Sequence, residues 1–416
     1  MRFLFDVPMV MVASVIAWKS MVLVTHQKSK SLADYAILLL YVFNCMPVLC
    51  DIIFGIPNYN RVFVGFKQAQ ENDLVCIIYD LYIILLFLAL YRVSKISNIK
   101  MEISTEYDVS IDLQKIPSVV LFALIIAPFL HLILSGNIGL ILIYGSYSDR
   151  GLPSDFTKTS GFLVIVSILA FCLWLFKQKI DVKRWIMFFI YGVLISWLNG
   201  KRYVVITVVY AFFYMYTTTK RNYRRKGVFP LLVTIGILTV VYAGYYLLNV
   251  RGNVNDVEEL YTSLRIDLGR DDVVKYTILE EYINGNHILE YPMQTVLSTL
   301  LMVVPRTLYP TKAYPHYAYL TASLYGTTVE NIPSGMTPSV LEMMIANFRW
   351  FGIPICILFL CQFCKWADNS NNYSKKFCFA ILLMGMLSQS LDAMLIVFYL
   401  VLFFIITKRI KFVFKR

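Results

Sequence analysis

Apolar residues fall in long blocks along this chain, separated by short polar segments. A run of roughly 18 or more apolar residues is typical of a helix that crosses a membrane. The blocks predict eleven such helices, within a range of about 10 to 13, at residues 7–25, 34–55, 73–91, 116–135, 160–176, 185–199, 203–218, 228–248, 339–363, 376–390 and 392–407. The pattern therefore predicts an all-α, polytopic membrane bundle.

One long polar interval divides the predicted bundle into three parts. Residues 1–248 carry the first eight helices, residues 249–338 form a large loop, and residues 339–416 carry the last three helices and a basic tail. The composition agrees, because 58% of the residues are hydrophobic and only 15% are charged. Soluble domains carry about 25% charged residues.

The large loop has helical order of its own. A capping box at Asp256 and Glu259 opens a first helix, which is expected to end before Gly269. A second short helix is expected from Asp271 to about Tyr282. Each has one apolar stripe, so both should be amphipathic and lie on the membrane surface or against the spans.

A further apolar segment follows in the same loop at residues 293–305. It lies between Pro292 and Pro305 and is too short to cross a membrane. We expect a re-entrant or interfacial helix here. Such a helix would bring Arg306, the next residue, to the outer membrane surface.

The positions of Lys and Arg give the bundle an orientation. Alternate loops and the C-terminal tail hold 23 of the 38 Lys and Arg residues, whereas the opposite set of loops holds 13. The positive-inside rule then places the C-terminus in the cytoplasm, the N-terminus outside and the loop 249–338 outside. The net charge of +12 is explained by these cytoplasmic flanks and anionic lipid, so no nucleic-acid partner is expected.

Cations on the predicted outer face oppose this trend. They are Lys201 and Arg202 in a tight hairpin, and Arg251, Arg265, Arg270, Arg306 and Lys312 in the large loop. Arginine binds phosphate oxygens in bidentate fashion and lysine acts as a point charge. The alternative is that they contact lipid headgroups or pair with nearby carboxylates.

Two further patterns bear on a binding site. Tyr309, Tyr314 and Tyr317 lie in one segment, where tyrosine marks a membrane interface or stacks on sugar rings. Glu342 and Arg349 are seven residues apart in the ninth predicted helix and would share one face of it. A charge inside a span indicates a functional site, although Glu342 also completes a capping box with Ser339.

A transfer reaction at this face would need a general base. The candidates are His316, Glu342 and Asp271, of which histidine titrates in the right range unaided. We find no metal-ligand spacing, phosphate-binding loop or nucleophile elbow in the sequence. No metal and no cofactor are therefore expected.

The chain resembles the bacterial oligosaccharide repeat-unit polymerases, the Wzy-type O-antigen and capsule polymerase family. Three stretches carry the resemblance: "GKRYVVI" at 200–206, the "VRGN" and "LRIDLGRDD" opening of the outer loop, and "VPRTLYPTKAYP" followed by "GMTPSVLEMMIANFRWFGI". The last contains a Pro-Arg-x-x-x-Pro-x-Lys segment and then a helix with Glu342, Asn347 and Gly352. The motifs cover residues 198–355, and the overall plan of spans also agrees.

The resemblance implies a metal-independent glycosyltransferase in the bacterial plasma membrane. It would transfer a growing glycan from undecaprenyl pyrophosphate to the non-reducing end of an incoming lipid-linked repeat unit, for O-antigen, capsule or exopolysaccharide. Its cations, with Arg251, Arg265, Arg270 and Arg306 foremost, would stabilise the leaving pyrophosphate, and a carboxylate or imidazole would accept the proton. A chain-length regulator and a flippase would be further partners.

Two other functions fit parts of the same pattern. A ligase that joins glycan to another lipid would share nearly every feature named above. A flippase for lipid-linked oligosaccharide would show two similar halves and charges within its spans. The chain shows no internal repeat, and its charges concentrate in one loop.

Overall fold

A computed structural model describes residues 3–26, 31–57, 59, 63–103, 116–136, 138–148, 154–177, 181–218, 236, 257–332, 335–370, 372–389 and 391–413. Within these residues every regular element is helical, as the apolar blocks predict. The chain forms two compact units. Unit 1 comprises Met1–Met101, Ala243–Asp368 and Leu383–Leu395, and unit 2 comprises Glu102–Tyr242, Asn369–Leu382 and Ile396–Arg416.

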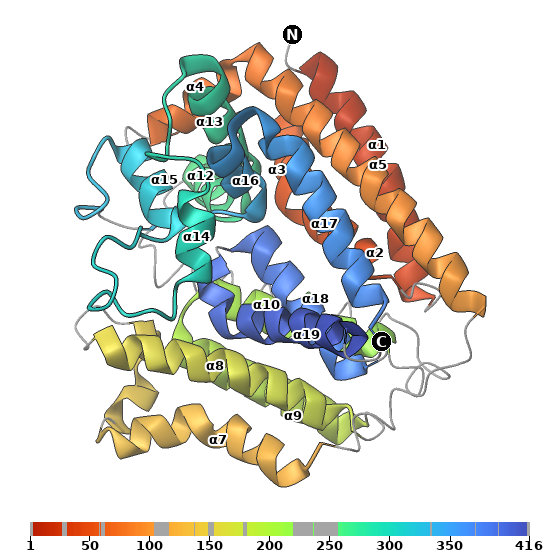
Figure 1. The fold of residues 1–416 in the computed structure, drawn as a ribbon, viewed down its shortest axis with the longest axis vertical. Coiled ribbons are helices and arrows are strands. Elements are labelled where there is room, and N and C mark those ends of the chain that lie inside the picture. Colours follow the sequence, from red (N-terminus) through yellow and green to blue (C-terminus); the bar gives the residue numbers. More distant parts are fainter. Residues whose placement is uncertain are drawn as a thin grey trace. The chain divides into compact units, whose positions relative to one another are not determined.

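Unit 1 contains the N-terminal helices and those of the large loop (Figure 1). Its elements are α1 (Phe3–Thr25), α2 (Leu32–Leu40), the π-helix η1 (Tyr41–Cys45), α3 (Met46–Phe54), α4 (Val64–Glu71), α5 (Asp73–Ile103), α12 (Val257–Leu268), α13 (Asp271–Ile278), the π-helix η7 (Leu279–Asn284), α14 (Gln294–Leu300), α15 (His316–Tyr325), α16 (Val340–Phe348), the short 3-10 helix η8 (Arg349–Phe351) and α17 (Gly352–Asp368).

Unit 2 is built on antiparallel packing of α7 against α8 (Figure 1). Its elements are α7 (Ser118–Leu134), the 3-10 turns η3 (Ile138–Leu142) and η4 (Ser146–Ser148), α8 (Ser154–Leu175), α9 (Val182–Asn199) and α10 (Arg202–Thr218). The last helices, α18 (Tyr373–Ser388) and α19 (Leu395–Val413), and the 3-10 turn η9 (Leu391–Met394) between them, supply residues to both units.

Four helical stretches are long and apolar enough to cross a membrane, which marks this as a membrane protein. They are Phe5–Thr25, Leu32–Phe54, Asp73–Ile99 and Val340–Asp368. Three shorter apolar helices, Ser118–Leu134, Thr159–Leu175 and Val397–Ile406, overlap other predicted spans, but eleven spans stay a prediction. The predicted span at 228–248 lies outside the described residues, apart from Gly236.

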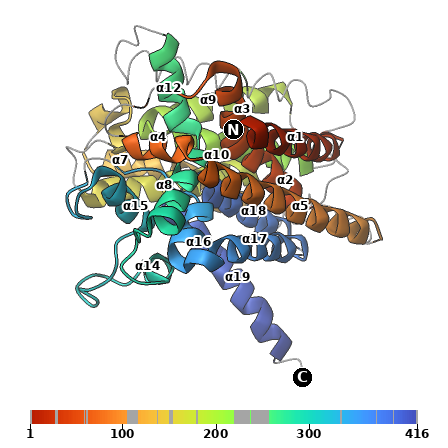
Figure 2. The same ribbon diagram turned by 90° about the horizontal axis from the view of Figure 1, so that it is seen from above.

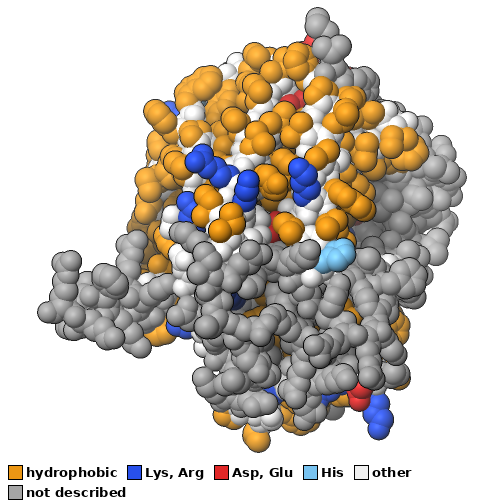
Figure 3. All heavy atoms as spheres, turned by 90° about the vertical axis from the view of Figure 1, so that its right-hand side faces the viewer, with side chains coloured by type: hydrophobic (Ala, Val, Ile, Leu, Met, Phe, Trp, Pro, Cys, Tyr) orange, Lys and Arg blue, Asp and Glu red, His pale blue; other side chains and the backbone are white. Residues whose placement is uncertain are grey.

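The outer surface of these helices suits a lipid environment. Trp18 is 71% exposed on α1, and Leu81 and Leu85 are more than half exposed on α5. Figure 3 shows hydrophobic side chains over most of the described part of one face, with Lys and Arg gathered along one border. An aqueous surface rarely exposes so large an apolar patch.

A proline inside the second span creates a binding point for the large loop. Pro47 has no N–H, so the carbonyl of Phe43 lacks its usual helical partner, and the helix takes a π-turn at Tyr41–Cys45. The backbone N–H of Arg270 donates to this Phe43 carbonyl at 2.9 Å. The loop is therefore tied directly to the span.

The two predicted helices of the large loop are present, as α12 and as α13 continued by η7. Gly269 separates them, and Gly285 ends the second in the left-handed conformation. Helix α13 is buried at all eight of its residues, so the second of the two expected placements, against the spans, holds for it. It packs on α4 and α16 instead of resting on a surface.

The prediction that Glu342 and Arg349 share one helix face is wrong. Helix α16 ends at Phe348, and Arg349 takes a positive φ of 50° that breaks the helix. Gly352 follows immediately and lets α17 pass close to α16, because a Cβ there would overlap the backbone of Met344 and Ile345. The stretch Val340–Asp368 is thus two helices joined by a sharp turn.

The apolar segment at 293–305 forms the short helix α14. Its polar residues Gln294, Thr295, Ser298 and Thr299 face inward, whereas Leu297 and Leu300 are 45% and 42% exposed. The chain after it forms an extended loop at the edge of unit 1 (Figure 2). This outward apolar face agrees with an interfacial helix.

Candidate functional site

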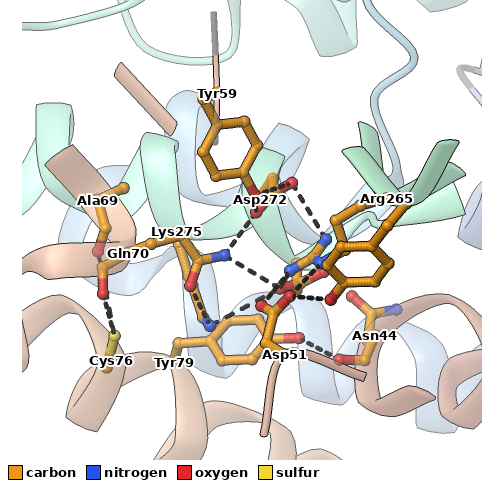
Figure 4. A network of polar contacts seen from close by, with 12 residues as sticks. Asn44, Asp51, Tyr59, Ala69, Gln70, Cys76, Tyr79, Arg265, Asp272 and Lys275 are labelled. Atoms are coloured by element: carbon orange, nitrogen blue, oxygen red, sulfur yellow. Dashed lines mark hydrogen bonds and ion pairs between the residues drawn. The ribbon is translucent and has the colours of Figure 1, made fainter. Parts of the chain in front are cut away.

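A buried network of charges surrounds Arg265 of α12 (Figure 4). Its guanidinium binds both oxygens of Asp51 at 3.0 Å, from Nε and Nη2. Nη2 also donates to Asp271 at 2.5 Å, and Nη1 donates to Asp272 at 3.0 Å. Tyr261 donates to Asp51 at 2.7 Å. A guanidinium has five N–H donors in a fixed fork, which suits this three-carboxylate cage.

Neutral donors and a lysine complete the network from α4 and α13. Lys275 lies 3.7 Å from Asp271, donates to Gln70 at 3.0 Å and sits 4.8 Å from the ring centre of Tyr79. Gln70 and the hydroxyl of Tyr59 donate to Asp272 at 2.5 and 2.8 Å. The network joins segments more than 200 residues apart in sequence.

Burial sets the electrostatics of this network. The charges of Asp271 and Asp272 raise the pKa of Arg265 well above its usual value, although burial alone would lower it. Burial raises the pKa of Asp272 to about 6, while Arg265 acts in the opposite direction. Two of our candidates, Arg265 and Asp271, are buried in this network, which holds α12 and α13 against the first spans.

Arg270 is also committed to the fold. It is 5% exposed and its Nε donates to the carbonyl of Ser388 at 3.1 Å. Its backbone N–H is the group that binds Phe43. This arginine pins the start of α13 between two distant segments, and it is poorly placed to meet a large ligand.

Among the described residues of the large loop, Arg306 is a cation that faces outward. It is exposed, and its guanidinium lies 4.2 Å from the ring centre of Tyr314. Stacking on an aromatic ring holds an arginine in place while its N–H groups stay free to donate. Leu308, two residues on, is 78% exposed. The arrangement places a held cation beside exposed apolar residues.

Lys312 lies behind Arg306. Its ammonium donates to the carbonyls of Val304 at 2.7 Å and Met302 at 3.3 Å, so it closes the loop that carries Arg306. Burial, and then the charge of Arg306, lower the pKa of Lys312. Of the predicted sugar-binding tyrosines, Tyr309 is exposed, and Tyr314 and Tyr317 are partly exposed.

Asn347 ties α14, α15 and α16 together beneath this loop. Its Oδ1 accepts from the backbone N–H groups of Thr295 at 3.1 Å and Val296 at 3.3 Å. Its Nδ2 donates to the Thr295 hydroxyl at 2.7 Å and to the Met343 carbonyl at 2.7 Å. The Thr295 hydroxyl in turn lies 3.4 Å from Nδ1 of His316.

His316 also lines a small cavity. The cavity is lined by Thr299, His316, Pro338, Ser339, Val340, Met343 and Leu391. The Nε2 atom of His316 is buried and has no hydrogen-bond partner. Burial lowers the pKa of His316 to about 4, so the ring is neutral at pH 7.

Glu342 acts locally, as its capping box predicts. Its carboxylate accepts from the backbone N–H and, at 2.5 Å, from the hydroxyl of Ser339. Ser339 lines the cavity, so Glu342 contacts the cavity through this hydroxyl.

The remaining candidates fall elsewhere. Lys201 and Arg202 follow Gly200, which is left-handed and so closely crossed by Gly145 that no side chain would fit there. This tight hairpin is the predicted one, and it belongs to unit 2. Arg349 is partly exposed at the break between α16 and α17. Arg251 lies outside the described residues.

Several members of the site were missed at the sequence level. Asp51, Tyr59, Gln70 and Lys275 were not among the candidates, yet they complete the Arg265 network. Asp51 carried a usable signal, because an acidic residue inside an apolar span requires a partner. Tyr59 and Gln70 carried none, since their roles depend on contacts made across the fold.

A pH test follows from the buried His316. Between pH 6.5 and about 4 the unfolded chain binds a proton at this residue and the folded chain does not. The free energy of unfolding is therefore unaffected by this residue above pH 6.5. It decreases by about 3 kcal/mol as the pH falls from 6.5 toward 4, because the unfolded chain alone binds the proton. We expect the melting temperature in detergent to fall more steeply over this range for the wild type than for His316→Gln. Equal slopes would contradict a buried neutral imidazole.

Comparison of this chain with protein-family models, with curated proteins and with solved structures gives no match.

Proposed function

We propose that this protein is a membrane glycosyltransferase that polymerises lipid-linked oligosaccharide repeat units. The observation that carries the proposal is Arg306, an exposed guanidinium held on Tyr314 in the loop that follows α14, a helix with an outward apolar face. A lipid pyrophosphate presents its charge at the depth where a membrane surface meets water. Arginine recognises that charge through paired hydrogen bonds.

The reaction is a group transfer with a charged leaving group. A hydroxyl oxygen of the acceptor sugar forms a bond to the anomeric carbon of the donor glycan as the bond to the pyrophosphate oxygen breaks. The electron pair stays on the pyrophosphate, where Arg306 offsets the developing charge, with Lys312 behind it. The proton of the acceptor hydroxyl passes to a base, and Glu342, reached through the Ser339 hydroxyl, is the carboxylate we favour.

Arg265, Arg270 and Asp271 are left out of this reaction. The side chain of each is buried and bound within the fold. The loop cations that were predicted to act together therefore include buried structural residues as well as the exposed Arg306. The resemblance of "VPRTLYPTKAYP" to the repeat-unit polymerases adds support, since it contains both Arg306 and Lys312.

Substitution of Arg306 in the native host tests the function. We expect Arg306→Ala to lower polymer formation by about ten- to a hundredfold, because one charge-assisted donor to the leaving group is lost. Arg306→Lys should keep part of the activity, since the charge remains without the fork. Extracted glycans separated on a gel, with membrane levels of the protein matched, provide the measurement.

The control is Lys67→Ala, which removes an exposed lysine that pairs only loosely with Glu71 at 3.9 Å. Its polymer should be unchanged. Long glycan chains in the Arg306→Ala variant would contradict the proposal. Loss of all glycan transfer to the final lipid, with polymer still formed, would indicate a ligase, and repeat units trapped on the cytoplasmic face would indicate a flippase.

A further inference from the structure

The orientation of the Asn347 carboxamide follows from its partners. Two backbone N–H groups, of Thr295 and Val296, point at one of its terminal atoms, and only an oxygen can accept from both. The other terminal atom is therefore the nitrogen. It donates to the carbonyl of Met343 and to the hydroxyl oxygen of Thr295.

This orientation determines where the hydroxyl hydrogen of Thr295 goes. Its oxygen already accepts from Asn347 at 2.7 Å, and the other group within reach of its hydrogen is Nδ1 of His316 at 3.4 Å. A neutral imidazole has one acceptor nitrogen and one N–H. Nδ1 is the acceptor, so the hydrogen of His316 is on Nε2, which is buried and without a hydrogen-bond partner on a ring that lines the cavity.

The two hydroxyl groups of the cavity have the opposite character. Thr299 donates its hydrogen to the carbonyl of Thr295 at 2.8 Å, and Ser339 donates its hydrogen to Glu342 at 2.5 Å. The Ser339 oxygen also accepts from the backbone N–H of Leu341 at 3.3 Å, so one of its lone pairs remains for a ligand. The cavity thus offers one donor, His316, and one acceptor, Ser339, and it has room for a single water-sized group.

A hydroxyl is the group that fits this set of partners. It can accept from Nε2–H of His316 and donate to Ser339, whereas a phosphate oxygen could only accept. The cavity is partly open rather than fully enclosed. A hydroxyl can enter while the sugar ring that carries it remains at the mouth.

We propose that this cavity binds one sugar hydroxyl of the acceptor repeat unit, with His316 as a neutral hydrogen-bond donor rather than a base. Thr295 and Asn347 are positioning residues that select this tautomer. The identity of the ligand rests on the proposed function, but the tautomer does not. Without substrate, the same partners suit a water molecule, which the hydroxyl would displace.

Nitrogen NMR of the full chain in lipid bilayers tests the tautomer. The chain has four histidines, so labelling with ¹⁵N-histidine and comparison with His316→Gln assigns the signals of His316. We expect Nδ1 unprotonated and Nε2 protonated at pH 7. Thr295→Val removes the hydroxyl at equal size, and the proton should then distribute between the two nitrogens. A wild-type ring protonated at Nδ1 overturns the proposal.

The ligand is tested by adding the lipid-linked repeat unit extracted from the host. Movement of the His316 Nε2–H signal supports a substrate hydroxyl in the cavity. An unchanged signal in a preparation that polymerises the same substrate would show that only water binds in the cavity. That result would overturn the proposal that a substrate hydroxyl binds there. A preparation that never polymerises while the tautomer is as expected counts against the proposed function alone.

Steady-state kinetics test the donor role of His316 independently. His316→Gln keeps an N–H donor and should raise KM for the repeat unit by less than tenfold, whereas His316→Met has none and should raise it about ten- to a hundredfold, with a smaller change in kcat. Equal loss of kcat in both variants would identify a base and overturn the donor role. Matched melting temperatures of the two variants exclude a difference in folding.

Discussion

Replacement of Arg265 by Met is expected to cost about 3–5 kcal/mol of folding free energy. The guanidinium is the common partner of Asp51, Asp271 and Asp272, all fully buried. Without it the three carboxylates are left with only Lys275 and neutral donors, and a buried uncompensated charge is among the most destabilising changes known. The yield of monodisperse protein and its melting temperature in detergent provide the measurement.

The matched control is Arg306→Met, the same substitution at an exposed arginine, which should change stability by less than about 0.5 kcal/mol. Adding Asp51→Asn and Asp272→Asn to Arg265→Met should restore part of the loss, because each removes an unpaired charge. An Arg265→Met protein that melts at the wild-type temperature would show that the network is not a structural one.

Replacement of Asn347 by Leu should cost about 3 kcal/mol. The substitution keeps the volume but leaves four polar groups without this partner: the N–H groups of Thr295 and Val296, the hydroxyl of Thr295 and the carbonyl of Met343. A buried group left unsatisfied costs roughly 1 kcal/mol or more. Thermal unfolding measures the loss, and proteolysis within 293–315 should show whether α14 separates first.

Asn331→Leu is the control for this substitution. Asn331 is exposed and bonds only its neighbour Thr328 within a turn, so its replacement should be nearly neutral. Asn347→Asp adds resolution, because it can still accept from the two backbone N–H groups but cannot donate to Thr295. We expect the Asn347→Asp variant to keep helix α14 folded better than Asn347→Leu does, while the hydrogen bonding of His316 through Thr295 is disturbed. Equal melting temperatures for Asn347→Leu and the wild type would contradict the role of Asn347.

The chemistry of the site separates two kinds of cation that look alike in sequence. Arg265 and Arg270 lie in one short stretch and carry the same charge as Arg306, yet both are buried and hydrogen-bonded within the fold. Local sequence gives no measure of this difference. It depends on Asp51 and on the carbonyls of Phe43 and Ser388, which are at least 118 residues away.

Sequence by itself determined which segments of this membrane protein are helical and where many of them end. The apolar blocks, Gly269, Gly285 and the Ser339 cap act within one or two helical turns, so their effect is local and readable. The same holds for the outward apolar face of α14. Chain direction across the membrane and the number of spans stay predictions.

Tertiary structure alone decided what the charged residues do. The cage around Arg265, the release of the Phe43 carbonyl to Arg270 by Pro47 and the chain from Asn347 through Thr295 to His316 all join segments distant in sequence. Hydrogen bonds and charge pairs are directional and short in range, so their partners are known only once the helices are packed.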